Sequence, residues 1–129
     1  MQITPFLMFT GQAEEAMNFY VSLFPRSRVV SLKKFGAEGP GKAGTVKQAR
    51  FELNGLPVMC IDSPAVHAFT FTASTSLFVD FDSREELDAA YAKLSPGGQI
   101  FMPPGNYGFS QHFAWVQDRF GFAWQLNLP

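Results

Sequence analysis

ITPFLMFTGQAEEAMNFYVSLFP, residues 3–25, decides the fold of this chain because it returns in the second half as TSLFVDFDSREELDAAYAKLSP, residues 75–96. The repeat keeps one constant offset across four pairs of matching residues: Glu15 with Glu86, Tyr20 with Tyr91, Leu23 with Leu94, and Pro25 with Pro96. Each half therefore opens with a strand, continues as a helix and stops at a proline. Two copies of one module bury a face that neither buries alone, and the cleft between the copies is a natural place for a ligand.

The first module has the predicted order strand, helix, strand, strand, strand. Its helix, Gln12–Phe24, carries apolar residues at helical spacing and ends before Pro25. Asn54-Gly55 is the strongest short signal for a hairpin between the last two strands. The glycine-rich stretch 36–44 is expected to form a mobile loop. The four strands are predicted over Ile3–Phe9, Arg28–Phe35, Val46–Leu53 and Leu56–Ile61.

The second module repeats this order after a linker. Ser83 and Glu86 have the spacing of a capping box, which predicts the start of a helix, and Pro96 marks its end. A loop is expected over 103–108, and Gly121 is expected to supply the positive φ of the last turn. The buried stripe of the helix is predicted to comprise Leu87, Ala90, Tyr91 and Leu94. The four strands are predicted over Ser74–Phe81, Gln99–Met102, Gln111–Val116 and Phe122–Leu128.

These patterns indicate an α+β fold, because in each module one strand is followed by a helix and then by a set of antiparallel strands. We expect residues 1–129 to form one domain, made of module 1–62, linker 63–73 and module 74–129. The two modules are expected to curve toward each other as an open mixed sheet. A chain of 129 residues buries enough apolar surface to fold without a disulfide or a structural metal.

Charge and cysteine content exclude several kinds of partner. The formal net charge is −1 and the signs are interspersed, whereas nucleic acids and anionic membranes attract clustered Lys and Arg, so neither partner is expected. Cys60 is the only cysteine, which rules out an intrachain disulfide and suits a reducing compartment. No segment has the pattern of a signal peptide or a membrane span. We therefore expect a cytoplasmic protein.

Three segments carry a resemblance to a known family: the opening stretch 3–25, GTVKQARFELNGLPVM at 44–59, and above all WVQDRFGFAWQLNLP at 115–129. They resemble the PhnB-like proteins, often labelled 3-demethylubiquinone-9 3-methyltransferase domains. That family belongs to the vicinal oxygen chelate superfamily, which includes glyoxalases, bleomycin-resistance proteins and dihydroxybiphenyl dioxygenases. The resemblance covers essentially the whole chain. It implies two βαβββ modules that form an open barrel, commonly in a homodimer.

The resemblance also implies a metal site, because enzymes of that superfamily hold a divalent ion with four His or Glu ligands on the first and last strands of each module. Imidazole and carboxylate groups supply the lone pairs that such an ion requires. The corresponding positions in this chain hold Pro5, Met59 or Cys60, Ser74 or Ser76, and Gln125. None is a strong ligand, so we expect neither a metal nor another cofactor.

The same positions suit a small-molecule pocket. Ser74, Ser76 and Gln125 are neutral hydrogen-bonding groups that would project into a cavity with apolar walls. The structural alternative is that the serines are solvated and that Gln125 satisfies backbone groups. The predicted ligand-binding residues are Leu7, Phe9, Cys60, Ser74, Ser76, Phe78, Trp115 and Gln125.

Other candidate catalytic groups favour structural roles. His112 could act as a general base, but a lone histidine at a strand end is more often structural or exposed. His67 is expected to be exposed in the linker. Cys60 lies in the apolar run VMCI, where a cysteine behaves as a small hydrophobe.

Two main hypotheses on function remain open at this point. The first is a binding module, without the usual metal centre, that holds a small, partly apolar molecule between the repeats. The second is a glyoxalase-like enzyme, of the lyase, isomerase or dioxygenase type, that acts on a small oxygenated substrate. An interaction scaffold is a third possibility. Methyl transfer is not expected, because no glycine-rich turn follows a parallel strand and opens a helix.

Overall fold

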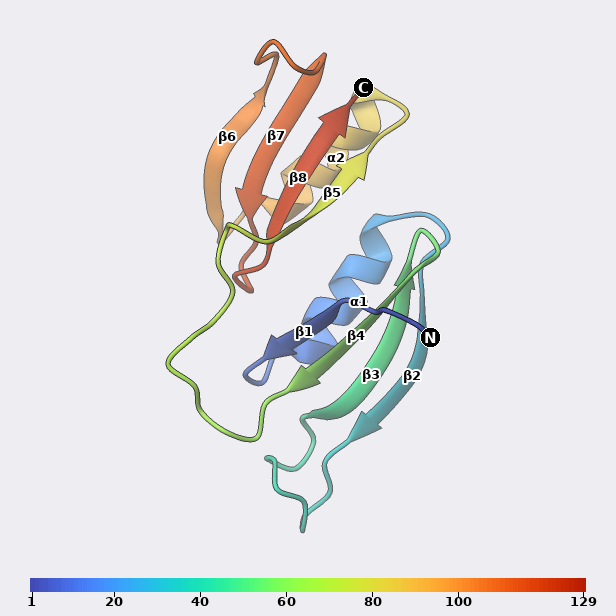
Figure 1. The fold of residues 1–129 in the computed structure, drawn as a ribbon, viewed down its shortest axis with the longest axis vertical. Coiled ribbons are helices and arrows are strands. Elements are labelled where there is room, and N and C mark those ends of the chain that lie inside the picture. Colours follow the sequence, from blue (N-terminus) through green and yellow to red (C-terminus); the bar gives the residue numbers. More distant parts are fainter. The chain divides into compact units, whose positions relative to one another are not determined.

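Both halves of the chain fold in the order strand, helix, strand, strand, strand (Figure 1). The computed structural model describes all of residues 1–129, which divide into two compact units. Unit 1 is Met1–Thr70 and unit 2 is Phe71–Pro129. The boundary falls inside the predicted linker 63–73. That the units make up one domain stays a prediction.

Unit 1 contains one helix and a four-stranded mixed sheet in the order β1-β4-β3-β2. The first and last strands, β1 and β4, are parallel, and the other neighbours are antiparallel. Its elements are β1 (Phe6–Phe9), α1 (Ala13–Leu23), β2 (Arg28–Lys34), β3 (Val46–Leu53) and β4 (Leu56–Asp62).

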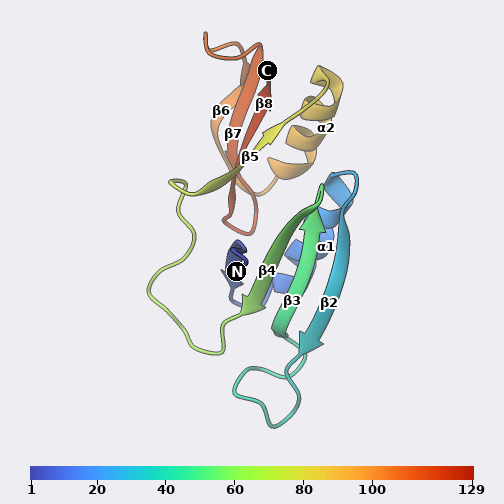
Figure 2. The same ribbon diagram turned by 45° about the vertical axis from the view of Figure 1, so that its right-hand side comes forward.

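Unit 2 repeats this topology, with the strand order β5-β8-β7-β6 and the parallel pair β5 and β8. In each unit the helix covers one face of the sheet (Figure 2). The elements are β5 (Ser76–Asp80), α2 (Arg84–Leu94), β6 (Gln99–Gly105), β7 (His112–Gln117) and β8 (Ala123–Leu128). The predicted α+β class and βαβββ order are confirmed. Neither helix is long and apolar enough to span a membrane.

The two helices form for the reasons that the sequence indicates. In α1 the buried side chains recur at helical spacing, at Ala13, Ala16, Met17 and Tyr20. In α2 the Ser83 side chain accepts a hydrogen bond from the Glu86 backbone N–H at 3.2 Å, which is half of the predicted capping box. Leu87, Ala90 and Leu94 are buried as predicted, whereas Tyr91 is only half-buried.

Helix α1 has no capping side chain of its own at Gln12, and the buried Asp62 at the end of β4 takes that role. One carboxylate oxygen of Asp62 accepts the backbone N–H groups of Gly11 (2.7 Å) and Ala13 (3.0 Å). The other accepts the N–H of Val46 at 2.9 Å. A charge near the helix start is favourable there, and the same side chain joins β4, β3 and the β1–α1 turn.

One loop prediction was wrong. The stretch 103–108 was expected to be a loop, but β6 continues through Pro103 and Pro104 to Gly105. Prolines are tolerated there because β6 is an edge strand and its register with β7 is irregular between Met102 and Gly105. The stretch 36–44 is a loop as predicted, and it folds against the buried ring of Phe35. Its mobility stays a prediction.

The close approach of that loop requires glycine. A Cβ atom at Gly41 would lie 2.4 Å from the Phe35 ring, and the N–H of Gly44 donates to the Phe35 carbonyl at 3.0 Å. The glycines therefore let the backbone wrap around an aromatic side chain.

Seven of the sixteen predicted strand ends agree with the structure, and seven others differ by one or two residues. The first strand of each module is shorter than predicted. Strand β1 begins at Phe6, because Pro5 lacks the N–H that would extend the ladder, although its carbonyl still accepts the N–H of Met59 at 2.9 Å. Strand β5 begins at Ser76, which leaves Ser74 in the preceding turn.

The strands of the two units differ in which face matching residues occupy. The repeat aligns Leu7 with Phe78 at the offset that the helices keep. In the structure Leu7 is buried, at 7% exposure, whereas Phe78 is 55% exposed. A shift of one residue between strand and helix is enough to move every side chain of a strand to the other face. The constant offset therefore holds for the helices and fails for the opening strands.

We expect Asp62→Ala to lower the free energy of unfolding by about 3 kcal/mol, because two buried N–H groups and one part-buried N–H group lose a charged acceptor. The check is urea denaturation followed by circular dichroism. Asp82→Ala removes an exposed carboxylate and is the matched control, with an expected change within about 0.5 kcal/mol. Equal effects of the two substitutions would contradict the assigned role of Asp62.

Candidate functional site

The candidate site is the face of the unit 2 sheet that points away from α2, which we call the open face of unit 2. His112 on β7 lies 2.7 Å from Asp88 of α2, so His112, Ala114 and Val116 point toward the helix. The alternate residues of β7 and their register partners point the other way. From β5, β7 and β8 these are Ser76, Phe78, Asp80, Phe113, Trp115, Gln117, Ala123, Gln125 and Asn127.

The centre of this face is one row across three strands. Phe78 on β5 pairs with Gln125 on β8, and Gln125 pairs with Trp115 on β7. The Gln125 side-chain amide donates to the Ser76 hydroxyl at 3.0 Å. On the other side of the row, the Phe101 ring lies 4.9 Å from the Trp115 ring. The row thus combines aromatic surface with neutral polar groups.

Trp115 carries an unused hydrogen-bond donor. Its indole Nε1–H is buried and has no hydrogen-bond partner within the protein. The other tryptophan, Trp124, donates its Nε1–H to the buried carboxylate of Asp118 at 2.9 Å. Buried donors are nearly always satisfied, so the unmatched donor of Trp115 calls for an explanation.

The Asp118 carboxylate has a structural role in the turn between β7 and β8. It accepts the backbone N–H groups of Phe120 (2.9 Å) and Phe122 (3.1 Å) in addition to the Trp124 indole. Gly121 has φ 94°, as the predicted turn requires. The closing segment of the chain is therefore held by one buried carboxylate.

A cluster of aromatic rings lies at one end of the same face. Phe113 is buried, and its ring centroid lies 4.9 Å from that of Phe109, 6.3 Å from that of Tyr107 and 6.2 Å from that of Phe78. These three surrounding rings are exposed, at 65% for Phe109, 40% for Tyr107 and 55% for Phe78. A gathering of exposed aromatic side chains is unusual on a protein surface and favours a binding role.

The predicted ligand-binding residues divide into three groups. Four lie together on the open face of unit 2: Ser76, Phe78, Trp115 and Gln125. Ser74 lies before β5 in a turn, where its hydroxyl is 2.7 Å from that of Thr72. The other three, Leu7, Phe9 and Cys60, are buried in unit 1 on the face that α1 covers.

The register of unit 1 decides which residue of β4 points toward the helix. Cys60 pairs with Leu7, and Asp62, on the same face, contacts the start of α1. Met59 pairs with Phe6 and lies on the opposite face, so Met59 and not Cys60 is on the open side of β4. Burial raises the pKa of the Cys60 thiol from 9.0 to about 12, and the nearby Asp62 charge adds to the shift.

The two histidines lie away from the open face. His112 is buried and joins β7 to α2 through Asp88, so it has the structural role that the sequence favours. His67 is exposed as predicted, 3.0 Å from the Ser63 hydroxyl and stacked on Phe69 at 4.6 Å.

The residues at the strand positions implied for a metal do not suit one. On the open sides of the two parallel strand pairs there is one carboxylate, Asp80, and no histidine or glutamate. The chain contains no group of three or more His, Cys, Asp or Glu side chains placed to bind an ion. The other open-side residues of these strands are Phe6, Met8, Pro57, Met59, Ile61, Ser76, Phe78, Ala123, Gln125 and Asn127.

Several members of the open face were not among the residues predicted from the sequence. Phe101, Phe113 and Asn127 border the central row, and Tyr107 and Phe109 belong to a loop. Strict alternation along 112–117, counted from a helix-facing His112, would have identified Phe113. No local signal indicates the loop aromatics.

Comparisons with known proteins agree on family and fold. The family model described as 3-demethylubiquinone-9 3-methyltransferase matches residues 1–127. A PhnB protein from Bacillus cereus is 52% identical, with 100% of both chains covered and a TM-score of 0.98. Protein PA1353 from Pseudomonas aeruginosa is 28% identical, with 99% of this chain and 97% of that chain covered and a TM-score of 0.85.

A more distant match shows the fold alone. The fosfomycin resistance protein FosX from Listeria monocytogenes, whose structure contains Mn(II), is 11% identical. The match covers 100% of this chain and 92% of that chain, with a TM-score of 0.68. The fold is thus the vicinal oxygen chelate type, which hosts different activities. No curated protein matches the sequence.

At pH 9 we expect the Cys60 thiol to react with iodoacetamide at least ~100-fold more slowly in the folded protein than in the protein unfolded in urea. The reason is that the thiolate is the reactive form. The unfolded thiol ionises near pH 9.0, whereas the folded thiol keeps its proton to about pH 12. The contribution of this group to stability is therefore intact below pH 9.0 and falls as the pH rises toward 12. Mass spectrometry of the single cysteine gives both rates, and equal rates would contradict the burial.

Proposed function

This chain belongs to the 3-demethylubiquinone-9 3-methyltransferase family, and from that premise we propose that it binds a small, partly apolar molecule on the open face of unit 2. The molecule carries a hydrogen-bond acceptor. The proposed site comprises Phe78, Gln125 and Trp115 in the central row, with Ser76 and Phe101 beside it.

The observation that carries this proposal is the buried, unpartnered indole N–H of Trp115. A ligand acceptor that reaches this donor would satisfy it, and such a hydrogen bond contributes about 1 kcal/mol. The site therefore favours a molecule with an acceptor, which is how a buried polar group confers specificity. A molecule without one forgoes this bond but can still contact the aromatic surface, because the donor is already buried and unpaired in the free protein.

The remaining contacts define the rest of the ligand. The rings of Phe78, Phe101 and Trp115 offer flat apolar surface, and Gln125 and Ser76 offer uncharged donors and acceptors. This mixture is typical of sites that bind small molecules. It matches four of the eight residues predicted from the sequence, whereas Leu7, Phe9 and Cys60 fill the interior of unit 1.

We propose that binding requires no metal. The open sides of the strands that would supply metal ligands carry no histidine or glutamate, and their one carboxylate is Asp80. Methyl transfer is not part of the proposal either. In unit 1 the turn between β1 and α1 follows a parallel strand and leads into a helix. Two of its backbone N–H groups, those of Gly11 and Ala13, already donate to the Asp62 carboxylate.

The test is a titration of ¹⁵N-labelled protein with coumarin, a neutral fused-ring molecule with a carbonyl acceptor. The chain has two tryptophans and therefore two indole N–H signals, which the Trp115→Phe variant assigns. We expect the Trp115 signal to move downfield as a hydrogen bond forms. The Trp124 signal is the internal control and stays in place, because its N–H already donates to Asp118.

Two serine variants sharpen this test. Ser76→Ala removes the hydroxyl that Gln125 contacts, and we expect coumarin to bind about 5-fold more weakly. Ser74→Ala changes a hydroxyl in the turn outside the strand and is expected to have no effect. An unmoved Trp115 signal at millimolar coumarin overturns the proposal. A stoichiometric divalent ion in protein purified without chelator overturns its metal-free part and favours the glyoxalase-like enzyme instead.

We further propose a homodimer located in the cytoplasm. The family resemblance implies a dimer, and Phe6 on the opening strand of unit 1 is 51% exposed. A single buried thiol suits a reducing compartment.

Light scattering after size-exclusion chromatography at micromolar concentration is expected to give about twice the 14.3 kDa mass of the chain. Replacing Phe6 with Glu is expected to shift the mass toward the monomer, because a charge buried in an interface is unfavourable. A monomer mass for the unmodified protein would rule out the dimer.

A further inference from the structure

We infer that the open face of unit 2 selects a positively charged organic ligand, a protonated amine or a quaternary ammonium group attached to an apolar body. This inference rests on the proposed function and narrows its ligand class. It depends on three features of the face: the absence of basic side chains, the exposed carboxylate of Asp80, and the exposed aromatic rings.

Basic side chains are absent from this face. The three Lys and Arg residues of unit 2 lie elsewhere, Arg84 and Lys93 on α2 and Arg119 in the turn between β7 and β8. The only ionisable side chain that the strands of the open face present is Asp80. An anionic ligand would therefore find no counter-charge, whereas a cation would find one.

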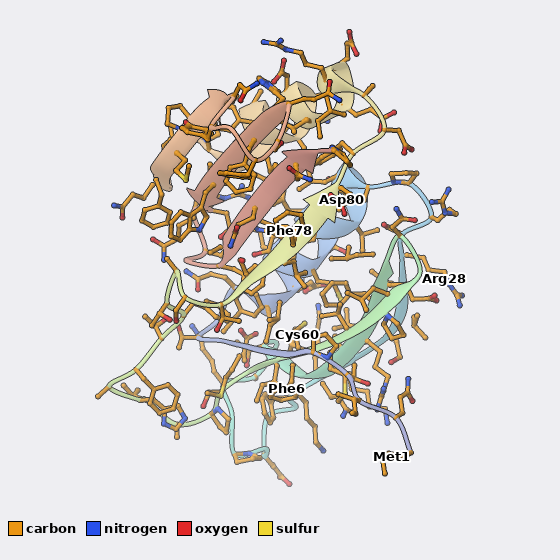
Figure 3. All side chains as sticks on the ribbon, turned by 45° about the horizontal axis from the view of Figure 1, so that its top comes forward. Met1, Phe6, Arg28, Cys60, Phe78 and Asp80 are labelled. Carbon is orange, nitrogen blue, oxygen red and sulfur yellow. The ribbon has the colours of Figure 1, made fainter.

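Asp80 has an available carboxylate. It lies on β5 beside Phe78, two positions along the same face (Figure 3). One of its oxygens accepts the Asn127 side-chain amide at 2.7 Å, which orients the group. Asp80 is exposed and forms no ion pair. Its charge is thus free to attract a cation at the edge of the aromatic surface.

The aromatic rings supply the second part of the recognition. Phe78, Tyr107 and Phe109 surround Phe113, and all three are exposed residues. A cation within about 6 Å of a ring centre is attracted by the electron-rich face of the ring. Unit 2 already uses this interaction internally, because the Arg119 guanidinium lies 4.4 Å from the Phe120 ring.

The corresponding face of unit 1 has the opposite character. Lys33 and Arg50 lie on the side of that sheet away from α1, and neither forms an ion pair. Glu52 on the same side is paired with Arg28 at 2.8 Å. The preference for a cation is therefore specific to the open face of unit 2 and is not a property of the whole surface.

The experiment compares three probes that share a benzyl group and differ in charge: benzyltrimethylammonium, benzyl alcohol and benzylsulfonate. Each is titrated into the full chain, and binding is followed by the side-chain amide signals of Asn127 and Gln125. We expect the cation to bind at least about 5-fold more tightly than the alcohol, and the sulfonate to show no binding.

Matched variants locate the interaction. Asp80→Asn is expected to weaken cation binding about 5-fold and to leave the alcohol unchanged, whereas Asp82→Asn removes the same charge from a neighbouring loop without effect. Phe109→Ala is expected to weaken cation binding, and Phe69→Ala, at an equally exposed phenylalanine of the linker, is not. All four positions are exposed, so each variant is expected to fold.

The outcomes separate this inference from the proposed function. If the alcohol or the sulfonate binds as well as the cation, or if Asp80→Asn leaves cation binding unchanged, the charge selection is wrong. Coumarin bound at Trp115 would still support a neutral-ligand site. If the cation binds and depends on Asp80 while coumarin leaves Trp115 unmoved, the cation site stands and the acceptor site fails. Binding of none of the benzyl probes overturns the inference.

Discussion

The alternation of side chains along each strand, with a helix packed on one side of the sheet, is the constraint on which the rest of this structure depends. Once α1 and α2 cover one face, every second residue is committed to a core and its neighbours to the open side. Cys60 is buried and Met59 is not for this reason alone. The same constraint places Phe78, Gln125 and Trp115 in one row.

Buried polar groups show how the two sides of the sheet are used. The buried carboxylates of Asp62 and Asp118 each accept three N–H groups. Asp62 joins β4 to β3 and to the β1–α1 turn, and Asp118 holds the β7–β8 turn to Trp124 of β8. On the open side, Trp115 keeps a buried donor without a partner. A protein interior rarely tolerates such a donor. The contrast between satisfied cores and an unsatisfied open face is what supports a binding role there.

Sequence reasoning succeeded where the signal is local. The helix boundaries follow from apolar spacing and from the Ser83 cap, and the hairpin at Asn54-Gly55 follows from its turn residues. It failed for β6, where two prolines suggested a loop, because an edge strand does not need their N–H groups. Leu7 and Phe78 were both predicted to line one pocket, but Leu7 is buried and Phe78 is exposed. The reason is that an alignment shifted by one residue exchanges the faces of a strand.

By itself the sequence determined the α+β class, the twice-repeated strand and helix order and the family, because these depend on periodicity, turn residues and long matching segments. Four of the eight residues that it predicted for a ligand lie together on the open face of unit 2. Only the tertiary structure decided which face each strand residue occupies, which donor is left unpaired and which loop aromatics join the cluster around Phe113. Those properties depend on register between strands far apart in the chain and on the side that the helix covers, and no local pattern encodes either.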